Sequence, residues 1–171
     1  MATNLEFIKS ASGTSVSSLS VTNCFSNKYD VYFCEIAKVD VTASNFLVFR
    51  FIDSGGSVIS ASEYDYAQLN LRSYSAFSES RATASTGFAL MPYVTPNAED
   101  GYGFASYIFN PYDSSSYSFV TQQGTSFING SGMFGTKQIG VHKVAEQLSG
   151  VNVSHPSGNF DNITINLFGV K

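Results

Sequence analysis

The chain has 171 residues, of which 43% are hydrophobic, 15% aromatic and 13% charged, with a net charge of −4 at pH 7. This composition excludes a disordered chain, and the length favours a single domain over residues 1–171 that can bury a sizeable core. The nine Lys and Arg residues are scattered instead of forming a basic stripe, which argues against a nucleic-acid partner.

Membrane and secretion signals are not expected. No window approaches the about 20 apolar residues of a membrane-spanning helix, so we predict no membrane partner. The first residues lack the cationic flank and the long apolar run of a signal peptide, so we expect synthesis in a cytoplasm.

Short strands separated by turns are predicted along the first half of the chain. In chain order they are residues 5–8, 15–21, 29–39, 45–52, 58–59 and 63–72. Residues 45–52 are apolar on both faces apart from Arg50, which predicts a strand in the middle of a sheet. We expect Arg50 to pair with Asp53 or Glu63. Residues 53–56, Asp-Ser-Gly-Gly, have the composition of a turn.

The second half of the chain continues in the same way. The expected strands are residues 88–91, 104–109, 117–121, 133–141, 151–154 and 163–168. Residues 73–86 are rich in Ser and Ala and are predicted to form a long loop, as are residues 95–103. The one expected helix is short, at residues 144–148.

The last stretch, residues 159–171, gives the clearest strand pattern, because apolar and polar residues alternate there. Many short strands with few helices predict an all-β fold, an antiparallel β-sandwich of jelly-roll type. The residues expected in its core are Val31, Phe33, Leu47, Phe49, Phe51, Leu69, Leu71, Ile108, Ile163, Ile165 and Leu167.

No sequence motif indicates an enzyme. Residues 53–56 are similar to the nucleophile turn of trypsin-like proteases, but both histidines, His142 and His155, follow Ser54 instead of preceding it. A simple turn is therefore expected. The histidines lack metal-ligand spacing, and His155 is expected in an exposed loop.

Cofactors and metals are likewise not expected. The pair Glu99 and Asp100 lies in a Gly-containing loop that could bind calcium, but a solvated loop is the favoured interpretation. Cys24 and Cys34 have no CxxC spacing. Two buried free thiols are favoured, and a disulfide across a hairpin is the alternative.

The ten tyrosines give the strongest surface signal in the sequence. A tyrosine ring combines a rigid apolar face with one polar tip, which suits protein interfaces and also sugar stacking. We favour a protein interface. The candidate interface residues are Tyr64, Tyr66, Tyr93, Tyr102, Tyr107, Tyr112 and Tyr117.

Six short segments also occur in a recognisable order. They are residues 29–32 (Tyr-Asp-Val-Tyr), 46–51 (Phe-Leu-Val-Phe-Arg-Phe), 53–56 (Asp-Ser-Gly-Gly), 62–66 (Ser-Glu-Tyr-Asp-Tyr), 108–111 (Ile-Phe-Asn-Pro) and 163–171 (Ile-Thr-Ile-Asn-Leu-Phe-Gly-Val-Lys). In this order the chain resembles small virion structural proteins of tailed, marine cyanophage-like bacteriophages. The resemblance implies a jelly-roll β-sandwich with a non-enzymatic role in the particle.

These observations together predict a structural protein located in a bacteriophage virion. The favoured role is an exterior capsid decoration or cement component that assembles as a symmetric homo-oligomer beside other capsid or tail proteins. The alternative is a tail- or fibre-associated carbohydrate-binding module that adsorbs to a host glycan.

Overall fold

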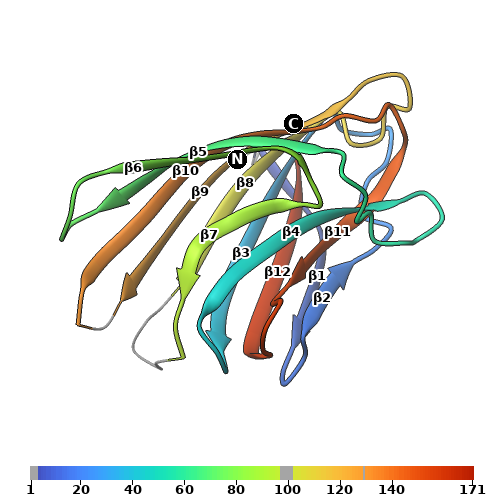
Figure 1. Cartoon of the computed structure of the whole chain (residues 1–171). Coiled ribbons are helices and arrows are strands. Elements are labelled where there is room, and N and C mark those ends of the chain that lie inside the picture. Colours follow the sequence, from blue (N-terminus) through green and yellow to red (C-terminus); the bar gives the residue numbers. More distant parts are fainter. Residues whose placement is uncertain (1–3, 97–101, 129) are drawn as a thin grey trace.

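Two antiparallel β-sheets pack face to face in the computed structural model, which describes residues 4–96, 102–128 and 130–171, without the side chains of residues 91–93 (Figure 1). The strands in chain order are β1 (Leu5–Gly13), β2 (Ser18–Val21), β3 (Val31–Val41), β4 (Asn45–Asp53), β5 (Tyr64–Arg72), β6 (Ser78–Ser85), β7 (Phe88–Val94), β8 (Tyr102–Phe109), β9 (Ser118–Ile128), β10 (Gly132–His142), β11 (Leu148–Ser154) and β12 (Phe160–Val170).

The strand order is that of a jelly roll with an extension. One sheet has eight strands in the order β1-β12-β3-β8-β9-β10-β5-β6, and the other has four in the order β2-β11-β4-β7. Without β5, β6, β9 and β10, the two sheets keep the pairing of an eight-stranded jelly roll. The predicted antiparallel β-sandwich is therefore confirmed. In Figure 1 the four extra strands extend the large sheet to the left, beyond the small sheet.

Most of the predicted core is buried between the sheets. The correctly predicted core residues are Leu47, Phe49, Phe51, Ile108, Ile163, Ile165 and Leu167. The closing strand β12 lies between β1 and β3, so the end of the chain is paired on both sides. We call the face of the large sheet that meets the small sheet its inner face, and the opposite face its outer face.

Four core predictions were wrong, because Val31, Phe33, Leu69 and Leu71 lie on the outer face. In β3 both faces are apolar, so alternation could not say which one is buried, and Tyr32, Cys34 and Ile36 take the inner positions. In β5 the inner positions are polar: Gln68 and Asn70 are buried while the leucines beside them face outward.

Two further element predictions are corrected. The predicted loop at residues 73–86 contains β6, which pairs along β5. The predicted helix at residues 144–148 is irregular backbone that leads into β11, because so short a segment cannot offset the cost of helix nucleation. The described residues include no helix that is long and apolar enough to span a membrane.

The turn predicted at residues 53–56 is confirmed. The Gly56 N–H donates to the Asp53 carbonyl at 3.1 Å, and the Ser57 N–H donates to the Asp53 carboxylate at 2.8 Å. Gly56 has a φ of 88°, which glycine adopts without strain.

Arg50 does not make the predicted ion pair with Asp53 or Glu63. Its guanidinium donates instead to the Thr86 carbonyl at 2.7 Å and to the Ser154 hydroxyl at 2.9 Å, across the small sheet. Cys24 and Cys34 are free and buried, as the favoured interpretation predicted. Burial raises the pKa of the Cys24 thiol to about 12, so it is a weak nucleophile at neutral pH.

Candidate functional site

An aromatic row crosses the outer face of the large sheet. Phe7, Phe168, Phe33 and Tyr107 stand directly opposite one another on β1, β12, β3 and β8. The ring centroids are 5.7 Å apart for Phe7 and Phe168, 6.1 Å for Phe168 and Phe33, and 5.2 Å for Phe33 and Tyr107. These are the spacings of favourable aromatic pairs, so the rings support one another along the row.

Apolar side chains continue this row onto the extension of the sheet. Ile139 on β10 stands in the same row, and the neighbouring row carries Phe109, Phe119 and Val141 on β8, β9 and β10. Phe119 is 44% exposed and Ile139 is 63% exposed. The small sheet packs on the inner face only, so no layer among the described residues covers these side chains.

The outer face is hollowed in two places. A groove of about 820 Å³ lies over β5, β6, β9 and β10 and is lined by residues that include Phe119, Ile139 and Arg81. A second groove of about 780 Å³ lies over β3, β8, β9 and β10 and is lined by residues that include Phe33 and Lys137. Both grooves are open, and both combine apolar walls with a few charged groups.

The seven predicted interface tyrosines do not form one surface. Tyr64 and Tyr102 are buried in the core, which corrects the expectation of a surface position for them. The side chain of Tyr93, on β7, is outside the described residues. The other four are at least partly exposed, Tyr66, Tyr107, Tyr112 and Tyr117, and Tyr107 belongs to the aromatic row.

Sequence reasoning missed the phenylalanines and aliphatic residues of the outer face. The signal was present, because β3 and β8 to β10 carry apolar residues at both odd and even positions. Such strands are normally buried on both faces. The exposed outer face is therefore unusual for its composition.

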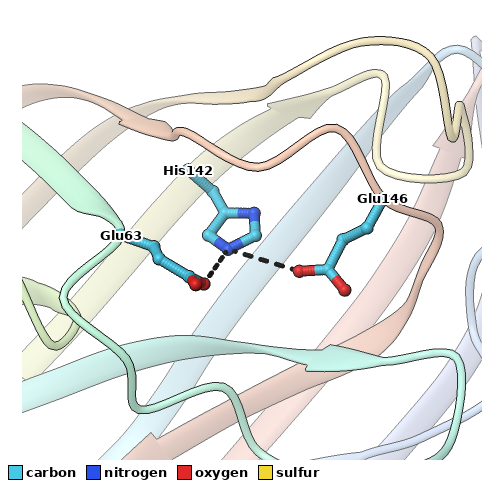
Figure 2. A group of neighbouring side chains, drawn as sticks. All are labelled: Glu63, His142 and Glu146. Carbon is cyan, nitrogen blue, oxygen red and sulfur yellow. Dashed lines mark hydrogen bonds and ion pairs between the residues drawn. The ribbon is translucent and has the colours of Figure 1, made fainter.

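A second feature is a cluster of Glu63, His142 and Glu146 at one end of the sandwich (Figure 2). Glu63 directly precedes β5, His142 is the last residue of β10, and Glu146 lies in the connection to β11. The pairing of His142 with Tyr64 brings His142 close to Glu63, which is 79 positions away in the sequence. Sequence reasoning missed the cluster because only the register of β5 and β10 creates it.

The imidazole of His142 is the centre of this cluster. Its Nε2 is 3.2 Å from a Glu63 carboxylate oxygen and 3.6 Å from a Glu146 carboxylate oxygen. The His142 side chain is fully buried and packs against the rings of Phe51 and Tyr64, whose centroids are 5.9 Å and 5.0 Å away. The ring is therefore held in place by core packing.

Negative charge accumulates around His142. Within the described residues neither Glu63 nor Glu146 forms an ion pair with a lysine or an arginine. Burial raises the pKa of Glu146, and the Glu63 and Asp53 carboxylates raise it further, while His142 opposes the shift. A proton or a cation bound between the two carboxylates would therefore relieve the repulsion between them.

The second histidine is also buried, which corrects the prediction of an exposed loop. His155 Nε2 donates to the Ala43 carbonyl at 2.8 Å, and its Nδ1 accepts the Ser157 N–H at 3.3 Å. Both ring nitrogens are thus used within the fold. The predicted calcium-binding alternative at Glu99 and Asp100 lies outside the described residues.

Comparisons with known proteins assign no family to the chain. No protein-family model matches the sequence, and no curated protein matches it significantly.

Proposed function

We propose that the chain is a non-enzymatic structural subunit of a bacteriophage virion, which assembles into a symmetric homo-oligomer and contacts other virion proteins through the outer face of its large sheet. The observation that carries this proposal is the uncovered apolar outer face, with Phe119, Ile139 and the aromatic row.

Exposed apolar surface of this kind is a reason for association. Burying it gains roughly 25 cal/mol per Å² of apolar area removed from water. Contiguous apolar patches on folded proteins commonly mark contact sites. Since only 13% of the residues are charged, a contact over this sheet desolvates few ionic groups.

The fold is consistent with this role but does not decide it. Jelly rolls occur in viral capsid proteins and also in lectins, and a fold alone does not fix a function. The placement in a virion rests on the resemblance of the six ordered segments described above. The exterior position on the capsid is proposed from the low charge and the abundant tyrosine of the sequence.

A carbohydrate ligand is the second candidate, and one observation favours it. The groove of about 780 Å³ is lined by the Phe33 ring at one side and by Glu35, Gln123 and Lys137 along its length. An aromatic face beside a few polar groups is the composition of a site for a small polar ligand. A tail-associated module that binds a host glycan would use such a groove.

Sedimentation velocity of the purified chain tests the assembly. We expect the wild-type chain to form an oligomer and Phe119→Ser to weaken it at least tenfold, about 1.4 kcal/mol, because an aromatic ring is lost from the contact. Phe46→Ser is the matched control, since Phe46 is exposed to a similar extent (46%) but lies on the small sheet.

Two outcomes would contradict the assembly. One is a wild-type chain that stays monomeric at every concentration, and the other is equal weakening by Phe119→Ser and Phe46→Ser. A glycan array run on the same samples addresses the second candidate. Specific binding that Phe33→Ser abolishes in a monomeric chain would replace the structural role with the carbohydrate-binding one.

A further inference from the structure

We infer that Glu63, His142 and Glu146 form a binding site for one divalent transition-metal ion, and that Zn²⁺ is the ion that fits best. The site is independent of the outer face and of the proposed structural role.

The geometry is close to that of a zinc site before the ion enters. Two ligand atoms that bind one zinc ion in tetrahedral geometry are roughly 3.4 Å apart. His142 Nε2 is 3.2 Å from one glutamate oxygen and 3.6 Å from the other, and all three ligand atoms lie within 4.8 Å of one another. Figure 2 shows Nε2 directed between the two carboxylates.

Zinc accepts this mixture of ligands, whereas the common hard cations prefer oxygen alone. An imidazole nitrogen with two carboxylates is a zinc-type set of three protein ligands, which leaves the fourth position for water. Calcium and magnesium select oxygen ligands and more of them. The Glu63 and Glu146 side chains are 33% and 32% exposed, so an ion can enter from solvent.

The electrostatics favour a cation over an internal ion pair. A protonated His142 has one Nε2–H to share between two carboxylates, and it directs that proton to one of them. The second carboxylate is then left without a cation, because neither glutamate pairs with a lysine or an arginine among the described residues. A divalent ion satisfies both carboxylates and the Nε2 lone pair together.

The surroundings also set the expected strength of binding. His142 Nδ1 has no hydrogen-bond partner among the described residues. Ligand histidines normally donate this second N–H, and its loss typically costs about ten- to a hundredfold in metal affinity. We therefore expect micromolar binding in place of the tighter binding of a complete structural zinc site.

The bound ion would tie three separate parts of the chain together. Glu63 precedes β5, His142 ends β10, and Glu146 lies in irregular backbone before β11. An ion that binds only the folded state stabilises it by mass action. Zinc should therefore raise the melting temperature.

Isothermal titration of the metal-stripped full chain with Zn²⁺, Mg²⁺ and Ca²⁺ tests the inference. We expect one zinc ion per chain, bound at least tenfold more tightly than either other cation. Glu146→Gln should weaken zinc binding at least tenfold with little change in volume. Glu79→Gln, an exposed glutamate on β6, is the matched control and should leave zinc binding unchanged.

A spectroscopic readout reports on the coordination of the ion itself. Co²⁺ in the same site should give visible absorption bands of tetrahedral intensity that zinc displaces, and these bands should be lost in Glu146→Gln. Absence of zinc binding by the wild-type chain would overturn the inference. So would zinc binding that Glu146→Gln leaves as strong as in the wild type.

Discussion

At the scale of single residues, Tyr64 connects the core to the cluster around His142. Its hydroxyl donates to the Ile59 carbonyl at 3.1 Å and accepts the Phe51 N–H at 3.1 Å. Its ring packs against Phe88 and His142, with centroids 4.9 Å and 5.0 Å away. The residue therefore satisfies two buried backbone groups and positions a candidate metal ligand. Burial raises the pKa of its hydroxyl, so Tyr64 stays neutral.

Replacement of Tyr64 by phenylalanine tests this role. Tyr64→Phe keeps the ring but leaves a buried carbonyl and a buried N–H without their partner, which costs about 1–3 kcal/mol in the free energy of unfolding. Urea denaturation measures the loss. Tyr117→Phe removes the same hydroxyl from an exposed ring and should change stability by no more than about 0.5 kcal/mol. Equal effects of the two substitutions would contradict the assigned role.

The predictability of individual positions depended on the neighbouring residues. Ile163, Ile165 and Leu167 could be assigned to the core because Thr164 and Asn166 between them are polar. Phe33 could not, because Tyr32 and Cys34 on either side are apolar as well. Only the packing of the small sheet against one face of β3 decides which set is buried.

At the scale of elements, β6 shows what pairing adds to a weak local signal. Its residues, Ser-Glu-Ser-Arg-Ala-Thr-Ala-Ser, are small and polar, and they predict a loop. The strand forms because β5 offers it a full row of backbone partners. It is also an edge of the large sheet, and edge strands offer unpaired backbone groups to a second chain.

The charges on β6 favour pairing with its own copy. If two β6 strands pair antiparallel with Ser80 opposite Ser80, Glu79 of each copy stands opposite Arg81 of the other. Opposite charges in such positions stabilise a sheet by about 0.2–1 kcal/mol per pair, and like charges destabilise it. We therefore expect β6 to supply a two-fold contact of the proposed homo-oligomer.

Charge exchange on β6 tests this contact. Glu79→Arg alone places like charges across the two-fold axis and should weaken the dimer by about 1–2 kcal/mol, roughly tenfold in the dissociation constant. The double variant Glu79→Arg/Arg81→Glu restores opposite charges and should recover the wild-type constant in sedimentation equilibrium. A double variant as weak as the single one would exclude this register.

At the scale of the whole molecule, the jelly-roll order and the extension have separate consequences. The eight jelly-roll strands form most of the core, whereas β9, β10, β5 and β6 enlarge one sheet toward the β6 edge. This enlargement carries Phe119 and Ile139 of the outer face and the β6 edge. The extension is also tied to the core, because Tyr64, Val120 and Phe134 on β5, β9 and β10 are buried in it. The β6 contact therefore depends on the extension, whereas the outer face runs over both parts of the large sheet.

The features that could be predicted from the sequence are those that local strand patterns determine. The antiparallel sandwich was predictable, because many short strands with turns between them leave few other folds. The outer face and the Glu63–His142–Glu146 cluster were not, because both arise from strand order and register. The alternation of residues within one strand indicates neither the strand order nor the register.

Cryo-electron microscopy of purified virions, with this chain traced in the map, is the most direct test of the proposed virion role. We predict jelly-roll density at repeated positions of the particle, with the outer face of the large sheet, including Phe119 and Ile139, against a neighbouring subunit. Particles without this density, or with the outer face open to solvent at every position, would contradict the account.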